Sequence, residues 1–427
     1  MTMLTSSISQ RARRAGGQPI SQLMHKALAQ PELVSLAAGF VDPQTLPVDA
    51  TRQAIDAVLG DPLRARAALQ YGTTPGYLPL REAVVEQLVA ADGLTGVAGL
   101  SAERVVITAG SNQMLHLLAD TLFDPGDIVL CAAPTYFVYV GLLHNLGVRT
   151  LGIASDDNGL IPEAVDEALQ ALERERQLHR VKAIYVVSYF DNPSGTTLSH
   201  QRRQQLVELA RRWSKEHKIH VIEDAAYRDL RLEGPDLPSL LAADPEGDTV
   251  IYTQTFSKSF SPGLRVGWAV LPEALVGPVC ELKGNLDFGS PNFAQHVIAV
   301  ALERGLVAEQ LGRLRAAYRT KRDAMLEGLE RHMHKLPGVR WAHPTGGLYV
   351  WLELPEPVAT GPDGQLFDQA VAEGVLYVPG EYCYAPEGVP VPRNRIRLSY
   401  GVQSPERIRT GIAALARAVG HQLEDCR

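Results

Sequence analysis

Short apolar runs rich in β-branched residues alternate with longer helical stretches between Val105 and Leu271. This alternation is typical of βαβ units, in which mainly parallel strands form one central sheet covered by helices. The sequence predicts seven such strands: Val105–Thr108, Ile128–Cys131, Thr150–Ile153, Ala183–Val187, His220–Glu223, Val250–Gln254 and Val266–Leu271. We therefore expect an α/β fold with a seven-stranded, mainly parallel sheet in a large domain.

The pattern changes in the last quarter of the chain. Between the predicted strands of the region Val105–Leu271 we expect helices such as Ile161–Gln177, with Pro162 in its first turn. From about residue 311 we expect one long charged helix, Leu311–His332, and then two hairpin-like runs, Gly347–Leu354 and Ile396–Gly401. A chain of 427 residues also exceeds the size of an ordinary single core. The expected division is residues 1–55 (N-terminal arm and part of a small domain), 56–305 (large domain) and 306–427 (rest of the small α+β domain).

Charge and cysteine content exclude several classes of protein. The net charge of −7 leaves no excess positive field for a nucleic-acid backbone. The four cysteines, Cys131, Cys280, Cys383 and Cys426, are far apart and form neither a C-x-x-C pair nor a zinc-ligand set. No apolar run approaches the roughly 20 residues that span a bilayer. We expect a cytoplasmic protein without a metal.

The first 31 residues contain Arg11, Arg13 and Arg14 but no acidic residue. An organellar transit peptide has this composition. The alternative that we favour is an exposed N-terminal arm that leads into the amphipathic stretch Ile20–Leu28.

Polar residues that follow strands are the first candidates for a ligand site, because open parallel sheets bind ligands at the carboxyl ends of their strands. Gly110, Ser111 and Asn112 follow the first predicted strand and precede a helix. A glycine turn and a helix N-terminus favour an anion such as phosphate, although the same residues also make an ordinary helix cap.

Lys258 has an unusual setting for a lysine. It lies among hydroxyl residues, including Thr255 and Ser257, directly after a predicted buried strand, and Arg265 follows seven residues later. The chain contains only eight lysines, and most others occur in charged helical segments. A lysine near apolar walls loses its proton more easily and can attack an aldehyde, as Schiff-base chemistry requires. A surface lysine in a Ser-rich turn is the alternative.

Two further strand ends carry chemically useful side chains. Asp224 ends the run His220–Asp224 and Tyr227 follows three residues later. An aspartate of this kind can keep a pyridine nitrogen protonated, but it is also a common turn residue. Asn192 lies in Asn192-Pro193-Ser194-Gly195, which by itself is a good turn.

Taken together and in this order, these segments resemble the fold-type I pyridoxal-phosphate enzymes. The similarity is to the class I/II aminotransferases near the aminoadipate/kynurenine aminotransferase branch. It runs from the segment Ser35–Gly39 to the segment Arg395–Tyr400, nearly the whole chain. The match of the Asn-Pro-Ser-Gly, Asp224/Tyr227, Ser-Lys and Arg265 elements at their spacing is specific.

The resemblance implies roles for these residues around pyridoxal 5'-phosphate. Lys258 would form the Schiff base and move the proton, Asp224 would pair with the ring nitrogen, and Tyr136 would stack on the ring. Asn192 and Tyr227 would form hydrogen bonds to the ring oxygen. The implied phosphate site consists of Ser111, Asn112, Thr255, Ser257 and Arg265. Asp191, which precedes Asn192, adds a charge whose effect the sequence leaves open.

The resemblance also implies substrate contacts and a homodimer. Arg397 would bind the α-carboxylate of the amino acid, with Gly39 and Asn192 beside it. Arg395 is its rival, because residues two apart face the same side of a strand. Tyr71, in a Tyr-Gly…Gly…Leu-Arg motif, would reach the phosphate of the neighbouring subunit. Two aromatic residues after Pro379-Gly380, Tyr382 and Tyr384, would line the substrate pocket or form an exposed loop.

Three functions fit these residues. The first is transfer of the amino group of an L-amino acid to a 2-oxo acid. The second is another reaction of the same cofactor, such as decarboxylation, elimination, cyclisation or oxidation, because one electron sink serves them all. The third is a cofactor-binding regulator with a DNA-binding domain, for which a resemblance that begins by about residue 35 leaves little room.

Overall fold

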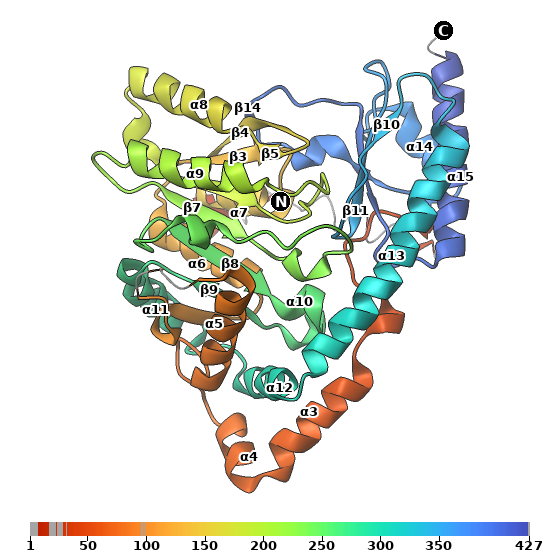
Figure 1. Ribbon diagram of the computed structural model, residues 1–427. Helices are drawn as coiled ribbons and strands as arrows, with labels where there is room; N and C mark the ends of the chain where they lie inside the picture. The colour runs from red at the N-terminus through yellow and green to blue at the C-terminus, as the bar shows by residue number, and fades with distance from the viewer. Residues whose placement is uncertain are drawn as a thin grey trace.

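The computed structural model describes residues 7–16, 23, 29–30, 32–94, 97 and 99–425 (Figure 1). A large sheet with its helices occupies one side of Figure 1, and a smaller sheet with long helices occupies the other. Cys426 lies outside the described residues, as does the predicted stretch Ile20–Leu28 except for the buried Leu23.

All seven predicted strands belong to the large sheet, whose strand order is β14-β4-β3-β6-β7-β8-β9-β2. Neighbours from β14 to β8 are parallel, whereas β9 runs antiparallel to both β8 and β2. The strands are β2 (Val105–Thr108), β3 (Ile128–Ala133), β4 (Arg149–Asp156), β6 (Val181–Val187), β7 (His220–Asp224), β8 (Val250–Thr255) and β9 (Gly267–Val270). The mainly parallel sheet is thus confirmed.

Two short strands were not expected. Among the described residues the sheet has nine strands, because β5 (Gly159–Leu160) pairs with β4 on one side and β14 (Glu387–Gly388) pairs with β4 on the other. The stretch after Ala385 therefore extends the edge of the large sheet. Arg149 binds the carboxylate of Glu387 at 2.6 Å and helps to hold this contact.

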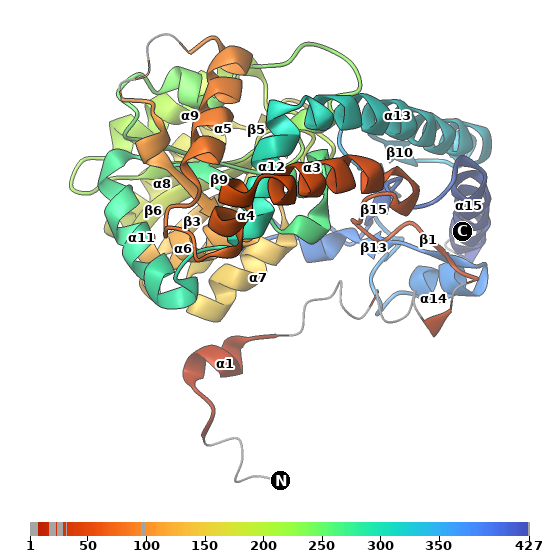
Figure 2. The same ribbon diagram turned by 90° about the horizontal axis from the view of Figure 1, so that it is seen from below.

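Helices cover both faces of the large sheet (Figure 2). Helices α6 and α7 pack together on one face, and α8 and α9 pack together on the other. The predicted helix after Ile161 is α8 and starts with Pro162 as expected. The helices of this part are α5 (Leu78–Asp92), α6 (Ser111–Leu122), α7 (Phe137–Leu146), α8 (Pro162–Arg174), α9 (His200–Trp213), α10 (Phe256–Ser259), α11 (Glu273–Asp287) and α12 (Asn292–Glu303).

The smaller sheet has the order β10-β11-β15-β13. The predicted runs become β11 (Tyr349–Glu353) and β15 (Arg395–Ser399), which pair antiparallel. They do not form a hairpin, because α14 (Gln365–Ala372), β12 (Val375–Leu376) and β13 (Val378–Pro379) lie between them in the chain. The remaining strand is β10 (Arg340–Trp341).

The N- and C-terminal segments meet beside this sheet. Strand β1 (Val34–Ser35) pairs in parallel with β12. The long predicted helix is α13 (Leu306–Met333), which begins after Gly305 and packs along α15 (Pro405–Asp425) (Figure 1). Two more helices, α3 (Val48–Gly60) and α4 (Pro62–Leu69), connect this region to the large sheet.

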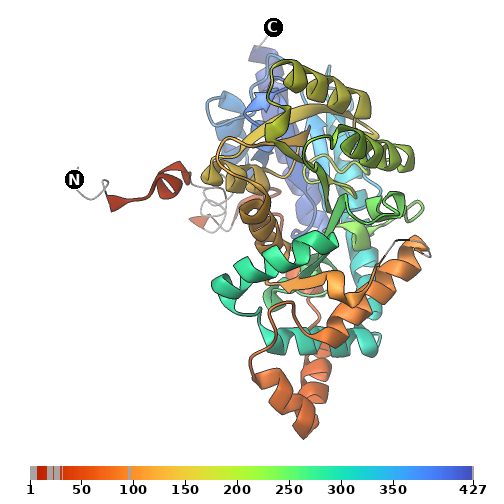
Figure 3. The ribbon, with the colours of Figure 1, turned by 90° about the vertical axis from the view of Figure 1, so that its left-hand side faces the viewer.

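Helix α1 (Gln10–Arg14) lies on the outside of the molecule (Figures 2 and 3) and contacts α7. Arg11 lies 3.8 Å from the carboxylate of Asp120, and Arg14 donates a hydrogen bond to the carbonyl of Asn145. The basic residues of the arm thus bind the outside of α6 and α7. Within the described residues, no helix is long and apolar enough to span a membrane.

Candidate active site

A cavity of about 350 Å³ lies where the carboxyl ends of the parallel strands meet the smaller sheet. Every predicted site residue except Tyr71 lines it. These residues are Gly39, Ser111, Asn112, Tyr136, Asn192, Asp224, Tyr227, Thr255, Ser257, Lys258, Arg265 and Arg397. Residues separated by more than 350 positions in the sequence, such as Gly39 and Arg397, share this one pocket.

Lys258 lies in α10, the single turn that follows β8, and its ammonium group faces the pocket. Its Nζ donates a hydrogen bond to the carbonyl oxygen of Gly39 at 2.9 Å. Burial, followed by the charges of Arg397 and Arg265, lowers the pKa of Lys258 to about 8. A larger share of the amine is therefore unprotonated near neutral pH, as attack on an aldehyde requires.

Asp224 forms the floor of the pocket at the end of β7. It is only 4% exposed, and its carboxylate accepts hydrogen bonds from the Tyr185 hydroxyl at 3.0 Å and from the Ala226 amide at 3.1 Å. Burial raises the pKa of Asp224 to about 6. Among the described residues, both hydrogen-bond donors to this carboxylate are neutral. A buried carboxylate without a cation favours a ligand that brings a protonated nitrogen to it.

The predicted phosphate site is a concave set of donors at the N-terminus of α6. Gly110 precedes the helix with a φ of +85°, in the region that favours glycine. A Cβ on Gly267 would lie 2.5 Å from the Ser111 amide nitrogen, so β9 and α6 can approach this closely only with glycine there. Free amide groups at a helix N-terminus, together with the hydroxyl of Ser257, suit an anion.

Arg265 completes this donor set. Its own φ of +51° is unusual for a residue with a side chain and is the kind of strain found at ligand sites. The guanidinium donates to the carbonyl of Ala109 at 3.2 Å and to the hydroxyl of Ser257 at 3.4 Å. It therefore lies between the two segments that supply the other donors.

Arg397 faces the pocket from β15 and is 2% exposed. Its Nη1 donates to Asn192 Oδ1 and its Nη2 to the carbonyl of Ala37, both at 2.8 Å. Its buried Nε has no hydrogen-bond partner within the described part of the chain. A buried guanidinium nitrogen without a partner is suited to an anionic ligand such as a carboxylate.

Arg395, the alternative to Arg397 for carboxylate binding, does not face the main pocket. Arg395 pairs with Glu353 at 2.5 Å and lines a separate cavity of about 270 Å³, which it shares with Asp191 and Tyr384. Asp191 accepts a hydrogen bond from Ser194, and burial raises its pKa to about 7. The charge of Asp191 is thus directed away from the main pocket, and Tyr384 does not line it.

Three aromatic residues of the pocket were not predicted from the sequence. Phe40, Phe137 and Tyr349 line the pocket, and Tyr349 places its ring 4.5 Å from the guanidinium carbon of Arg397. In the sequence, Tyr349 stands near the start of a predicted strand, shortly after two glycines, which could have marked it as a candidate. Its contact with Arg397 could not be predicted, because it depends on the pairing of β11 with β15.

Tyr71 lies outside the pocket and is 82% exposed. Its ring packs edge-on against Phe288, with ring centroids 5.7 Å apart. Phe288 is itself 63% exposed. The two rings form an apolar feature on the surface of a single chain.

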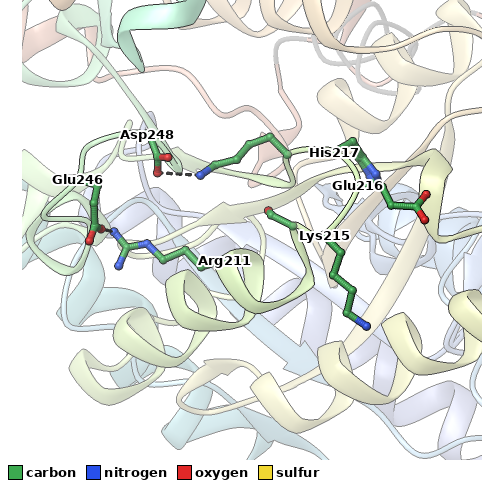
Figure 4. Close-up of a pocket in the computed structure, with 8 residues that line it drawn as sticks. Arg211, Lys215, Glu216, His217, Glu246 and Asp248 are labelled. Carbon is green, nitrogen blue, oxygen red and sulfur yellow. Dashed lines mark ion pairs between the residues drawn. The ribbon is translucent and has the colours of Figure 1, made fainter.

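Another surface hollow lies at the opposite ends of the strands (Figure 4). Arg211 pairs there with Glu246, while Lys218 pairs with Asp248 at 2.7 Å. These residues precede β7 and β8 or lie at the end of α9, where an open parallel sheet does not bind its ligand. Two of its cations are thus neutralised by carboxylates within the hollow, and the hollow lies at the wrong ends of the strands, so it is not the candidate site. No cluster of possible metal ligands occurs among the described residues.

The fold and this pocket define a class of protein, and sequence comparison identifies it. The family model for class I and II aminotransferases matches residues 31–415, so the chain belongs to that family. Membership makes it a pyridoxal-phosphate-dependent transaminase with the fold-type I architecture, as the resemblance implied.

Individual relatives cover nearly the whole chain. It is 33% identical over 416 residues to aromatic-amino-acid aminotransferase 1 of Thermococcus litoralis, covering 97% of this chain and 94% of the relative. It is 35% identical over 411 residues to 2-aminoadipate transaminase of Thermus thermophilus, covering 96% and 95%. Among solved structures, Pyrococcus horikoshii kynurenine aminotransferase superimposes with a TM-score of 0.89 at 32% identity, covering 99% and 98%.

Proposed function

We propose that Lys258 holds pyridoxal phosphate as a Schiff base and that this pocket transfers the amino group of an L-amino acid to a 2-oxo acid. One observation carries the assignment: a lysine with a lowered pKa, a buried aspartate and a buried arginine surround a single cavity. The three groups match an aldehyde, a ring nitrogen and a carboxylate, which are the polar ends of the cofactor and its amino-acid substrate.

The residues present fit the cofactor at both of its ends. Ser111, Asn112, Thr255, Ser257 and Arg265 supply donors for the phosphate, and Asp224 supplies a carboxylate for the ring nitrogen. When bound, pyridoxal phosphate acts as an electron sink for the bonds to the α-carbon of the substrate. Asp224 keeps that sink effective because its negative charge holds the ring nitrogen in the protonated state.

The other side chains position the substrate and move its proton. Arg397 binds the α-carboxylate through its fork of donors, with Asn192 and the backbone of Gly39 beside it. As a free amine, Lys258 would move the proton between the α-carbon of the substrate and the cofactor's aldehyde carbon. Tyr136 would cover one face of the ring, while Tyr227 and Asn192 would donate hydrogen bonds to its ring oxygen.

We further propose that the working molecule is a homodimer in which Tyr71 binds the phosphate in the partner's site. Its exposure, together with its absence from the lining of its own pocket, supports this arrangement. The division at residues 55 and 305 and the cytoplasmic location stay predictions. The latter fits the free state of Cys131, Cys280 and Cys383.

A donor screen tests the reaction type. Purified holoenzyme is incubated with single L-amino acids and 2-oxoglutarate, and both glutamate and the 2-oxo acid derived from the donor are measured. The proposal expects the two products in equal amounts with at least one donor. Carbon dioxide, ammonia or hydrogen peroxide formed in place of glutamate would show that another reaction of the cofactor predominates.

A further inference from the structure

Two buried tyrosines join the large sheet to the smaller sheet inside the pocket. Tyr227 follows β7 and Tyr349 begins β11. Their hydroxyl oxygens are 3.2 Å apart, and their rings meet edge-on with centroids 5.7 Å apart. Tyr349 is only 1% exposed, so water does not compete for this hydrogen bond.

The ring and the hydroxyl of Tyr349 make separate contacts. The ring face lies under the guanidinium of Arg397 at 4.5 Å, whereas the hydroxyl reaches past it to Tyr227. A Cβ on residue 39 would lie 2.5 Å from the Tyr349 hydroxyl oxygen. The glycine at position 39 therefore makes room for this hydroxyl, which a phenylalanine would not need.

Either hydroxyl could donate in the hydrogen bond between Tyr227 and Tyr349. If Tyr227 donates its hydrogen into the pocket, the number of donors and acceptors decides which one does. A phenol has one hydrogen and two acceptor lone pairs. Asn192 Nδ2, at 3.5 Å from the Tyr227 oxygen, can only donate. Once the single hydrogen of Tyr227 points to the cofactor, the hydroxyl of Tyr349 must donate to Tyr227 as well.

The charged and titratable groups around these phenols come from several elements. Burial and the neighbouring phenols Tyr349 and Tyr136 raise the pKa of Tyr227, and Arg397, which approaches from β15, opposes this rise only in part. Lys258, in α10, places its Nζ 5.8 Å from the Tyr227 ring centroid. Two others, Asp224 at the end of β7 and Arg265 after α10, line the same pocket.

We propose that Tyr349 is a positioning residue whose hydroxyl donates to Tyr227 and thereby directs the proton of Tyr227 to the ring oxygen of bound pyridoxal phosphate. This inference rests on the proposed function.

A hydrogen bond accepted by Tyr227 makes its own O–H a stronger donor. A stronger donor at the ring oxygen makes that oxygen less basic, and the ring oxygen shares the proton of the Lys258 Schiff base. Tyr349 therefore lowers the pKa of that Schiff base.

The test is a pH titration of the visible absorption band of the purified holoenzyme. Tyr349→Phe removes the hydroxyl but keeps the ring under Arg397. We expect the midpoint of the titration to rise by roughly 0.5–1 pH unit, the worth of one ordinary hydrogen bond. Affinity for 3-phenylpropionate, a carboxylate without an amino group, should stay unchanged in Tyr349→Phe and fall in Tyr349→Leu, which loses the ring too.

Two controls separate this role from a general loss of packing. Tyr377→Phe removes another buried hydroxyl, which donates to the Thr360 carbonyl outside the pocket, and should leave the midpoint unchanged. Tyr227→Phe should raise the midpoint further than Tyr349→Phe, and combining the two should add nothing, because Tyr349 acts through Tyr227.

The outcomes are distinct. A titrating band whose midpoint is the same in wild type and Tyr349→Phe would overturn this inference alone, and so would additive shifts in the double variant. A wild-type protein that forms no Schiff-base band with pyridoxal phosphate would overturn the proposed function together with it.

Discussion

Arg395 and Arg397 are two residues apart on β15, yet they face different cavities. Both side chains lie on the same face of the strand. On the neighbouring strand β11, however, Arg397 is opposite Trp351, whereas Arg395 is opposite Glu353 and pairs with its carboxylate. Arg397 stays over the main pocket and binds Asn192. A periodicity argument cannot separate such neighbours, because it assigns a face of the strand and not a position along it.

Replacement of Arg397 should therefore be far more damaging than replacement of Arg395. Hydrogen bonds to charged groups contribute roughly 1.5–3 kcal/mol each, so Arg397→Ala should lower kcat/KM for the amino acid by about 10–150-fold or more. Arg397→Lys should also be poor, because an ammonium does not reproduce the planar fork. Steady-state kinetics with the best donor measures both.

Arg395→Ala is the matched control and should change kcat/KM little. An amine without an α-carboxylate gives a second control, since its slow half-reaction should hardly respond to Arg397→Ala. A large, carboxylate-dependent loss in Arg395→Ala with none in Arg397→Ala would contradict the assignment.

Asp224 offers a second test at the level of one side chain. Asp224→Ala should fold but lose turnover by orders of magnitude, because an unprotonated pyridine is a poor electron sink. Circular dichroism reports the fold and the donor assay reports turnover. Asp191→Asn is the control, since that buried carboxylate faces the neighbouring cavity. Near-normal turnover in a folded Asp224→Ala protein would rule out this role.

Among the elements, β9 and α6 make the closest approach in the phosphate site. Gly267→Ala would bring a Cβ within 2.5 Å of the Ser111 amide nitrogen, so the N-terminus of α6 must move. We expect weaker binding of pyridoxal phosphate, measured by fluorescence titration, and a lower Tm.

Gly312→Ala, on the exposed side of α13, is the control. A Cβ there meets nothing within 4 Å, and alanine should stabilise the helix by about 0.5–1 kcal/mol without affecting the cofactor. Equal cofactor affinity in Gly267→Ala and wild type would show that this close approach is not needed.

Long elements could be predicted from the sequence and short ones could not. The seven buried strands show as continuous apolar runs because both of their faces are covered. Strands β5 and β14 have two residues each and depend on the edge of β4, so no local pattern marks them. Helix α13 was expected from Leu311 but begins at Leu306, since Gly305 adopts the left-handed conformation that ends the preceding turn.

At the scale of the whole molecule, the pocket requires segments from both ends of the chain. Its large-sheet residues could be predicted because they follow strands, where polar side chains stand out. Tyr349 and Phe40 could not, because their position depends on how the smaller sheet packs against the large one. Tyr71 was predicted by resemblance alone, and the role that we propose for it depends on a second subunit.

Subunit mixing tests that role. Tyr71→Ala and Lys258→Ala proteins should each be inactive or nearly so, and hybrid dimers should regain activity because one of their two sites has both residues. The measurement is turnover before and after the two proteins are mixed and allowed to exchange. Self-mixed samples of each variant are the controls. A fully active monomer in analytical ultracentrifugation would end the proposal of shared sites.

The central claim is that Lys258 carries the cofactor, and reductive trapping tests it most directly. Borohydride converts a Schiff base of pyridoxal phosphate into a stable amine, which peptide mapping by mass spectrometry then locates. The account predicts the label on Lys258 in the wild-type protein and no specific label in Lys258→Ala. A label on any other lysine, such as Lys283 or Lys321, would contradict it.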